Sequence, residues 1–202
     1  MNDRQARETE MSATDRLFFA LFPPAAVSAQ VYALQQDLRV RHGLWGRAIA
    51  MDRLHVKLCN LGDYRGLPSN IVAKAREAAS CVRAPVFDVI FDRAFSFAGR
   101  SRNRPFVLRS HEGARSIQNF QRELGKSMMA HGLGKFVRPY TPHMTLLYDT
   151  ADVSEQPVDP VSWRCAEFRL VHSMLGQTRH VSLGDWRFSE SETSTPEWAQ
   201  AS

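Results

Sequence analysis

Two histidines lie in short stretches of similar pattern. The stretch "LHVKLCNLGD" places His55 two positions before Lys57, and "TPHMTLLYD" places His143 two positions before Thr145. The stretches are 88 residues apart, and in both the residue between the two polar side chains is apolar. Side chains at positions i and i+2 of a strand point to the same face. Each stretch therefore predicts a buried strand that presents, near its middle, an imidazole beside a hydrogen-bond donor.

A pair of imidazoles suits the cleavage of a phosphodiester. The reaction needs one proton removed from the attacking water or hydroxyl and one proton given to the leaving oxygen on the other side of phosphorus. Two imidazoles that titrate near neutrality can do both. A neighbouring hydroxyl or ammonium can donate to the non-bridging oxygens, where charge must be stabilised. Chemistry of this kind requires neither a metal nor a cofactor.

The alternation of strand side chains also predicts which neighbours share the face of each histidine. These are Lys57 and Cys59 in the first stretch, and Thr145 and Leu147 in the second. The residues between them are apolar, and we expect them to pack inward. Each strand would then have one face in the core and one face available for chemistry.

Composition and charge favour a globular domain with anionic partners. The chain has 202 residues, of which 44% are hydrophobic, enough for a sizeable core in one domain or two small lobes. The net charge is +5, and between Asp15 and Ser189 there are 24 basic against 15 acidic side chains. Such a body favours nucleotides or RNA, although a basic balance also fits proteins that bind neither.

Other features exclude several classes of protein. The longest apolar run, "LFFALFPPAAV", contains two prolines and is shorter than the ~20 residues of a membrane-spanning helix. The first fourteen residues are polar and lack the apolar segment of a secretory signal. The cysteines Cys59, Cys81 and Cys165 show no C-x-x-C pattern, so neither disulfides nor a zinc site is indicated. We expect a monomeric, cytoplasmic protein that does not associate with membranes.

Strand and helix patterns alternate along the chain and predict an α+β fold. We expect residues 15–189 to form a single domain, with disordered tails at 1–14 and 190–202. Residues 86–98 and 105–110 are predicted to form a hairpin. The predicted strands are 16–22, 54–61, 86–98, 105–110, 144–148, 166–175 and 180–188, and the predicted helices are 25–42, 68–84 and 114–131.

The two histidine stretches, one in each half of a basic chain that opens with "RLFFALFPP", resemble the two-histidine (2H) phosphoesterases. The resemblance is strongest to the RNA 2′,3′-cyclic phosphodiesterases once named 2′-5′ RNA ligases. It extends from Arg16 to about Phe188 and includes the closing "FRLVHSMLG". It implies a bilobal fold, in which two pseudo-symmetric lobes of antiparallel sheet and helices surround a central cleft. One histidine strand from each lobe would line that cleft.

The resemblance also implies a function. The protein would hydrolyse the 2′,3′-cyclic phosphate ends of RNA, or cyclic nucleotides, to 2′-phosphates without a metal. His55 would be the acid that protonates the leaving 3′ oxygen, and His143 the base that activates water. We predict that Lys57, Thr145 and Tyr148 bind substrate. Lys57 stands where the family has Thr or Ser, and Tyr148 stands where many members carry arginine.

Two other functions fit parts of the pattern. A non-catalytic RNA or nucleotide binder with the same cleft is suggested by Lys57, because it alters the catalytic signature. A metal-dependent hydrolase could use His55 and His143 as ligands. However, neither motif, H-V-K or H-M-T, contains a carboxylate, and neither stretch has an H-x-H or H-x-x-x-H spacing. Either histidine alone would fit a core position, and only their pairing argues for a site.

Overall fold

The computed structural model describes residues 13–97, 103–111 and 114–189. In this part of the chain, eight strands form one antiparallel sheet in the order β6-β3-β4-β5-β2-β1-β7-β8. The elements, with η for a 3₁₀ turn, are β1 (Asp15–Leu21), α2 (Ala25–Arg41), η1 (Met51–Arg53), β2 (Val56–Tyr64), α3 (Ser69–Cys81), β3 (Phe87–Ser96), β4 (Arg104–Arg109), α4 (Arg115–Ala130), η2 (Gly134–Phe136), β5 (Met144–Asp149), β6 (Gln156–Cys165), β7 (Glu167–Met174) and β8 (Arg179–Arg187).

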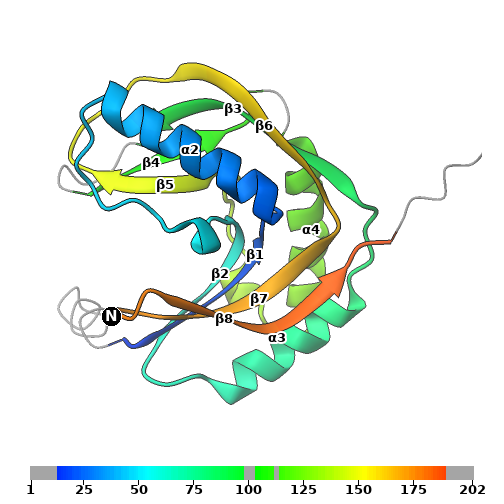
Figure 1. Cartoon of the computed structure of the whole chain (residues 1–202). Helices are drawn as coiled ribbons and strands as arrows, with labels where there is room; N and C mark the ends of the chain where they lie inside the picture. Colours follow the sequence, from blue (N-terminus) through cyan, green and yellow to red (C-terminus); the bar gives the residue numbers. More distant parts are fainter. Residues whose placement is uncertain (1–12, 98–102, 112–113, 190–202) are drawn as a thin grey trace, which may run out of the picture.

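The sheet consists of two four-stranded halves that meet at its centre. β2 and β5 are joined through a single residue pair, Val56 with Met144. Figure 1 shows the two halves diverging, with α2 over the half that contains β3 to β6 and α3 beside the half that contains β1, β7 and β8. The predicted α+β class and its arrangement in two pseudo-symmetric lobes are confirmed.

The two histidine strands are paired in the same way within their halves. β2 pairs with β1, and β5 pairs with β4, and both ladders skip a residue at the same place; the β1–β2 ladder also skips Leu61. The residues skipped at the matching place, Leu58 and Leu146, form β-bulges. The pairs on either side of the bulges are Ala20 with Lys57 and Phe19 with Cys59 in one half, and Val107 with Thr145 and Phe106 with Leu147 in the other.

The two matching bulges, at Leu58 and Leu146, are each supported by a glutamine from a helix. The fully buried Gln35 of α2 donates to the Leu146 carbonyl at 2.5 Å and to the Ile49 carbonyl at 3.2 Å. Gln121 of α4 donates to the Leu58 carbonyl at 3.1 Å. A bulge interrupts the ladder, so its buried carbonyl needs another donor. Because α2 follows β1 and α4 follows β4, each helix supports the histidine strand of the opposite half.

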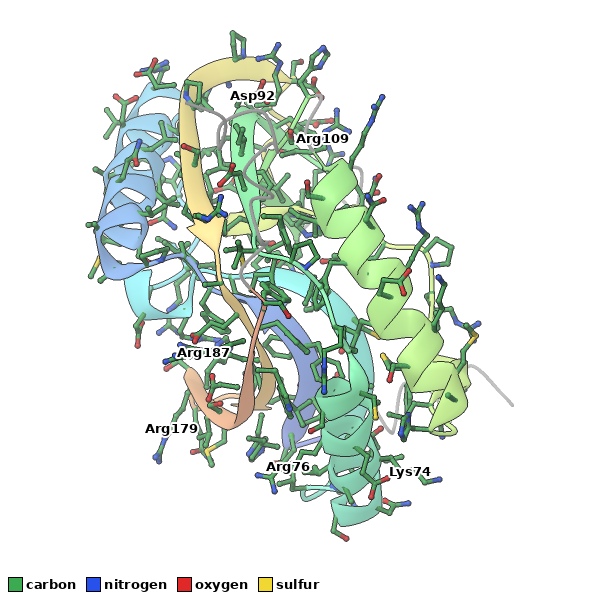
Figure 2. All side chains as sticks on the ribbon, turned by 90° about the vertical axis from the view of Figure 1, so that its right-hand side faces the viewer. Lys74, Arg76, Asp92, Arg109, Arg179 and Arg187 are labelled. Carbon is green, nitrogen blue, oxygen red and sulfur yellow. The ribbon has the colours of Figure 1, made fainter. Side chains whose placement is uncertain are left out.

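Helices α3 and α4 cover the core face of the β1–β2 half. Four apolar residues spaced three or four apart lie on one side of α4 and are at most 2% exposed, namely Ile117, Phe120, Leu124 and Met128. The Ser127 hydroxyl donates to the Ala78 carbonyl at 2.7 Å, which joins the two helices. Figure 2 shows them side by side, with Arg76 on α3, whose Nε donates to the Leu183 carbonyl of β8 at 2.7 Å.

Strand β6 was not predicted. Its segment contains Pro157 and Pro160, which remove backbone donors and argue against a strand. The structure accommodates them because β6 is an edge strand that pairs with β3 alone among the described strands. Its buried residues Val161, Trp163 and Cys165 alternate as a half-buried strand requires.

Two predicted positions are also wrong. The histidines do not lie near the middle of their strands, since β2 begins at Val56 and β5 begins, as predicted, at Met144, one residue after each histidine. Thr14, which we assigned to a disordered tail, bonds through its backbone to Tyr64 at 2.9 Å and to Leu175 at 2.8 Å. The rest of the predicted tails, 1–12 and 190–202, lies outside the described residues. No helix within the described ranges is long and apolar enough to cross a membrane.

The bulge contacts predict a cost for removing the buried amide. Gln35→Leu should lower the free energy of unfolding by about 1 kcal/mol, because the carbonyls of Leu146 and Ile49 each lose a donor, while the Leu146 carbonyl keeps the amide of Ile49 at 2.7 Å. Urea denaturation measures this, with Gln30→Leu on the exposed side of α2 as the matched control. Equal stability of the two variants would show that the amide does not support the bulge.

Candidate active site

Both candidate histidines are held by the same backbone hydrogen bond. Nδ1 of His55 bonds to the carbonyl of Arg53 at 2.8 Å, and Nδ1 of His143 bonds to the carbonyl of Thr141 at 2.8 Å. A carbonyl only accepts, so Nδ1 carries the proton and the neutral ring has its basic lone pair on Nε2. In each ring Nε2 is thus the atom available for proton transfer.

The pairing of β2 with β5 places both motifs on one face of the sheet. Val56 and Met144 are fully buried, so the residues on either side of them point to the opposite face. In an antiparallel pair these neighbours lie crosswise, and each histidine is opposite the donor of the other motif. We call this surface the histidine face and define it by His55, Lys57, His143 and Thr145.

The predicted positions of Cys59 and Leu147 on this face are wrong. Each follows a bulged residue, and a bulge places two successive side chains on the same side. Leu147 is therefore fully buried in the core. The Cys59 thiol donates to the Phe136 carbonyl at 3.3 Å, and burial raises the pKa of this thiol to about 11.

The bulges bring Asn60 and Tyr148 to the histidine face instead. Asn60 pairs with Phe18, whose ring is stacked on His55 with 5.0 Å between centroids. Tyr148 follows the buried Leu147 and is 44% exposed. The predicted position of Tyr148 beside the site is thus consistent with the structure, whereas sequence reasoning assigned nothing to Asn60.

Two aromatic rings lie beside His143, and one of them carries a hydroxyl that bonds to Nε2. The ring of Phe97 meets His143 edge-on at 4.8 Å between centroids, and that of Tyr140 lies at 5.1 Å. The Tyr140 hydroxyl is 3.2 Å from Nε2 of His143. Burial raises the pKa of Tyr140, so the phenol keeps its proton and is the donor to Nε2.

Sequence reasoning missed two residues that contact His55. The ring of His180, from β8, meets His55 edge-on at 5.4 Å between centroids. Nη2 of Arg53 donates to Nε2 of His180 at 3.2 Å, while the carbonyl of Arg53 holds His55. A signal for His180 was present, because it lies two positions before Ser182 and repeats the pattern of the two motifs. The sequence gives no such signal for Arg53, because only folding brings this residue to β8.

Burial and neighbouring cations keep the imidazoles neutral. Burial lowers the pKa of His55 to about 3; the bond to the Arg53 carbonyl opposes this, and the positive charge of Lys57 adds to it. Burial also lowers the pKa of His143, with a further contribution from Lys57, and it lowers that of His180 to about 4. An anion bound beside these rings would have the opposite effect, since it favours imidazolium.

The positive charge of Lys57 acts on both candidate histidines and lowers the pKa of each. Its ammonium is 5.3 Å from the centroid of the Phe18 ring. Burial lowers the pKa of Lys57, and the like charge of Arg16 adds to this effect, while Asp63 opposes it. Arg16 and Asp63 are themselves paired through two bonds of 2.6 and 2.7 Å. Lys57 thus supplies positive charge at the site.

Metal coordination finds no support in the side chains. Across residues 13–97, 103–111 and 114–189, no three His, Cys, Asp or Glu side chains are grouped so that they could hold a metal ion. The two motifs contribute one imidazole each to the histidine face and no carboxylate.

Comparisons with known proteins identify relatives along most of the chain. The sequence profile of the 2′-5′ RNA ligase superfamily matches residues 23–175. The RNA 2′,3′-cyclic phosphodiesterase of Escherichia coli (strain K12) is 29% identical over 190 residues, which are 89% of this chain and 100% of that protein. The crystal structure of E. coli LigT complexed with 3′-AMP is similar with a TM-score of 0.69 and 28% identity, over 88% of this chain and 99% of that one.

A more distant structure shares the fold. The protein TT0787 of Thermus thermophilus has a TM-score of 0.68 at 20% identity, over 87% of this chain and 99% of that one. The two-lobed arrangement is thus found in a protein with little sequence similarity to this chain.

The electrostatics predict that anion binding and protonation of His55 are coupled. In ¹⁵N–¹H NMR, we expect His55 to remain neutral between about pH 8 and about pH 5, and inorganic phosphate to raise its pKa. The imidazole signal that is absent from the spectrum of His55→Gln is that of His55. A His55 that titrates at the same pH with and without phosphate would show that the anion binds elsewhere.

Proposed function

Since the chain belongs to the 2′-5′ RNA ligase superfamily, we propose that it is a metal-independent phosphodiesterase that hydrolyses 2′,3′-cyclic phosphate ends of RNA or nucleotides to 2′-phosphates. The observation that carries the proposal is the pair of imidazoles on one face, each held through Nδ1 and each with Nε2 available. The E. coli relative is named RNA 2′,3′-cyclic phosphodiesterase, and a related structure holds 3′-AMP. Both support a nucleotide substrate.

In the proposed reaction, His143 acts as the general base and His55 as the general acid. Nε2 of His143 takes a proton from water, whose oxygen forms a bond to phosphorus. The bond from phosphorus to the 3′ oxygen breaks, and protonated Nε2 of His55 gives that oxygen its proton. In the free protein the Tyr140 hydroxyl is bonded to Nε2 of His143, so the attacking water would take its place.

Two residues of the histidine face would stabilise the phosphate. Thr145 lies opposite His55 and can donate its hydroxyl to a non-bridging oxygen. Lys57 lies opposite His143 and adds an ammonium, which attracts the anion as a point charge. The bound anion would in turn raise the pKa of His55 and supply the protonated acid that the reaction requires.

A second candidate function, nucleotide binding without hydrolysis, is favoured by Lys57. An ammonium lacks the fixed geometry of the hydroxyl that the family carries there, and it also lowers the pKa of both imidazoles. In this case the protein would bind the cyclic-phosphate end and leave it intact.

The test of the proposed function is turnover of adenosine 2′,3′-cyclic phosphate and of a trinucleotide with a cyclic-phosphate end. His55→Ala and His143→Ala should each lower kcat/KM by about 10²-fold or more, since each loses one proton-transfer group. Phosphorus NMR of the products distinguishes 2′- from 3′-phosphate. His111→Ala, at an exposed position after β4, is the control.

The outcomes separate the candidates. Full activity in His143→Ala would contradict the mechanism, and loss of activity with EDTA would favour a metal-dependent hydrolase. Binding of both substrates without turnover by the unaltered protein would establish the binding function.

The role of Lys57 is tested by two substitutions with opposite expectations. If its charge binds phosphate, Lys57→Met should weaken binding of cyclic nucleotides and reduce the dependence of binding on salt. If it has replaced a more effective hydroxyl, Lys57→Thr should raise turnover above that of the unaltered protein. Turnover and binding assays on both variants decide between these roles. No change in either variant would show that Lys57 does not contact substrate.

A further inference from the structure

The segment 46–49 lies along the edge of β5 beyond its single contact with β2. Ala48 pairs antiparallel with Leu147, and the amide of Ile49 donates to the Leu146 carbonyl at 2.7 Å. The amide of Gly46 donates to the Asp149 carboxylate at 2.6 Å. A Cβ on Gly46 would lie 1.8 Å from the backbone oxygen of Tyr148, so only glycine permits this approach. The segment is therefore held firmly against β5.

This pairing places Arg47 beside Tyr148. In the register set by Ala48 and Leu147, Arg47 is opposite Tyr148, and opposite side chains share a face. Both act electrostatically on Arg53, the residue that holds His55, so both lie near the site. The Tyr148 hydroxyl also acts on Tyr140, which is bonded to His143. Arg47 and Tyr148 therefore extend the histidine face beyond the two imidazoles.

The side chains of this extension are available to a ligand. The Tyr148 side chain is 44% exposed, and Trp45, directly before the segment, is 91% exposed. Arg47 is exposed and makes no hydrogen bond or ion pair with any other residue in the described ranges. An exposed aromatic ring beside an arginine is the combination with which proteins bind single-stranded nucleic acid, the ring by stacking on a base and the arginine by contacting phosphate.

We propose that Arg47 and Tyr148 form a second nucleotide subsite, which binds the nucleotide preceding the 3′-terminal residue of a single-stranded RNA. Tyr148 stacks on the base of that nucleotide, and the Arg47 guanidinium binds its phosphodiester. The inference rests on the proposed function, because the terminal cyclic phosphate is placed between the two histidines. It commits to RNA ends, in preference to cyclic mononucleotides, as the substrate.

The spacing along β5 agrees with this assignment. Thr145 and Tyr148 pair with Val107 and Pro105, two residue steps apart on β4. Two steps along a strand cover ~6.6 Å, which is the order of one nucleotide step along an extended single strand. A chain with its cyclic phosphate at Thr145 thus reaches Tyr148 with its next nucleotide.

The experiment compares kcat/KM for adenosine 2′,3′-cyclic phosphate with that for an adenosine trinucleotide ending in the cyclic phosphate. Arg47→Ala and Tyr148→Ala should each lower the value for the trinucleotide by about tenfold, since each removes one stacking or phosphate contact. For Arg47→Ala the value for the mononucleotide should fall by less than about threefold, because the mononucleotide lacks the phosphodiester that Arg47 is proposed to bind. Arg164→Ala, an exposed arginine on β6, controls for the loss of one positive charge.

For Arg47→Ala, equal losses for the two substrates, or no loss for either, would overturn the subsite. An unaltered protein that hydrolyses neither substrate would overturn the proposed function, and binding would then decide the inference. In that case Arg47→Ala and Tyr148→Ala should still bind the labelled trinucleotide more weakly than Arg164→Ala does. Fluorescence anisotropy measures this binding. Equal binding by all three variants would overturn the inference independently of catalysis.

Discussion

One antiparallel residue pair, Val56 with Met144, joins the two halves of the sheet, and the positions of the candidate catalytic side chains depend on it. Both side chains are fully buried, so their neighbours must point to the opposite face. A shift of this pairing by one residue would place the two histidines on opposite faces of the sheet. The buried amide of Gln35 and the matching amide of Gln121 protect the register, because each binds the bulge of one histidine strand.

The positive charge of the histidine face has two opposing effects. Lys57 and Arg53 attract an anion to the site, yet the same charges lower the pKa of His55. Burial acts in the same direction and is the larger cause. In the free protein, His55 therefore carries no proton on Nε2 to donate at neutral pH. A bound phosphate would raise the pKa of His55 and so favour the protonated ring. Substrate binding and activation of the acid are thus coupled by the electrostatics of one small surface.

Local patterns in the sequence predicted much of the fold, and tertiary contacts determined the rest. The repeated histidine stretches and the apolar side of α4 follow from periodicity alone. The bulges do not, because Leu58 and Cys59 are both compatible with a core, and alternation gives no sign of a skipped residue. Strand β6 was missed because tolerance of its prolines depends on its place at the sheet edge. The contact of Arg53 with His180 joins segments distant in sequence.

In the proposed mechanism both imidazoles act on a single phosphate. A crystal structure with adenosine 2′-monophosphate bound tests it most directly, since this is the product of the proposed reaction. We expect one phosphate with oxygens within ~2.6–3.2 Å of Nε2 of both His55 and His143, and with the Tyr140 hydroxyl displaced from His143. A phosphate bound to only one of the two rings, or bound away from the histidine face, would contradict it.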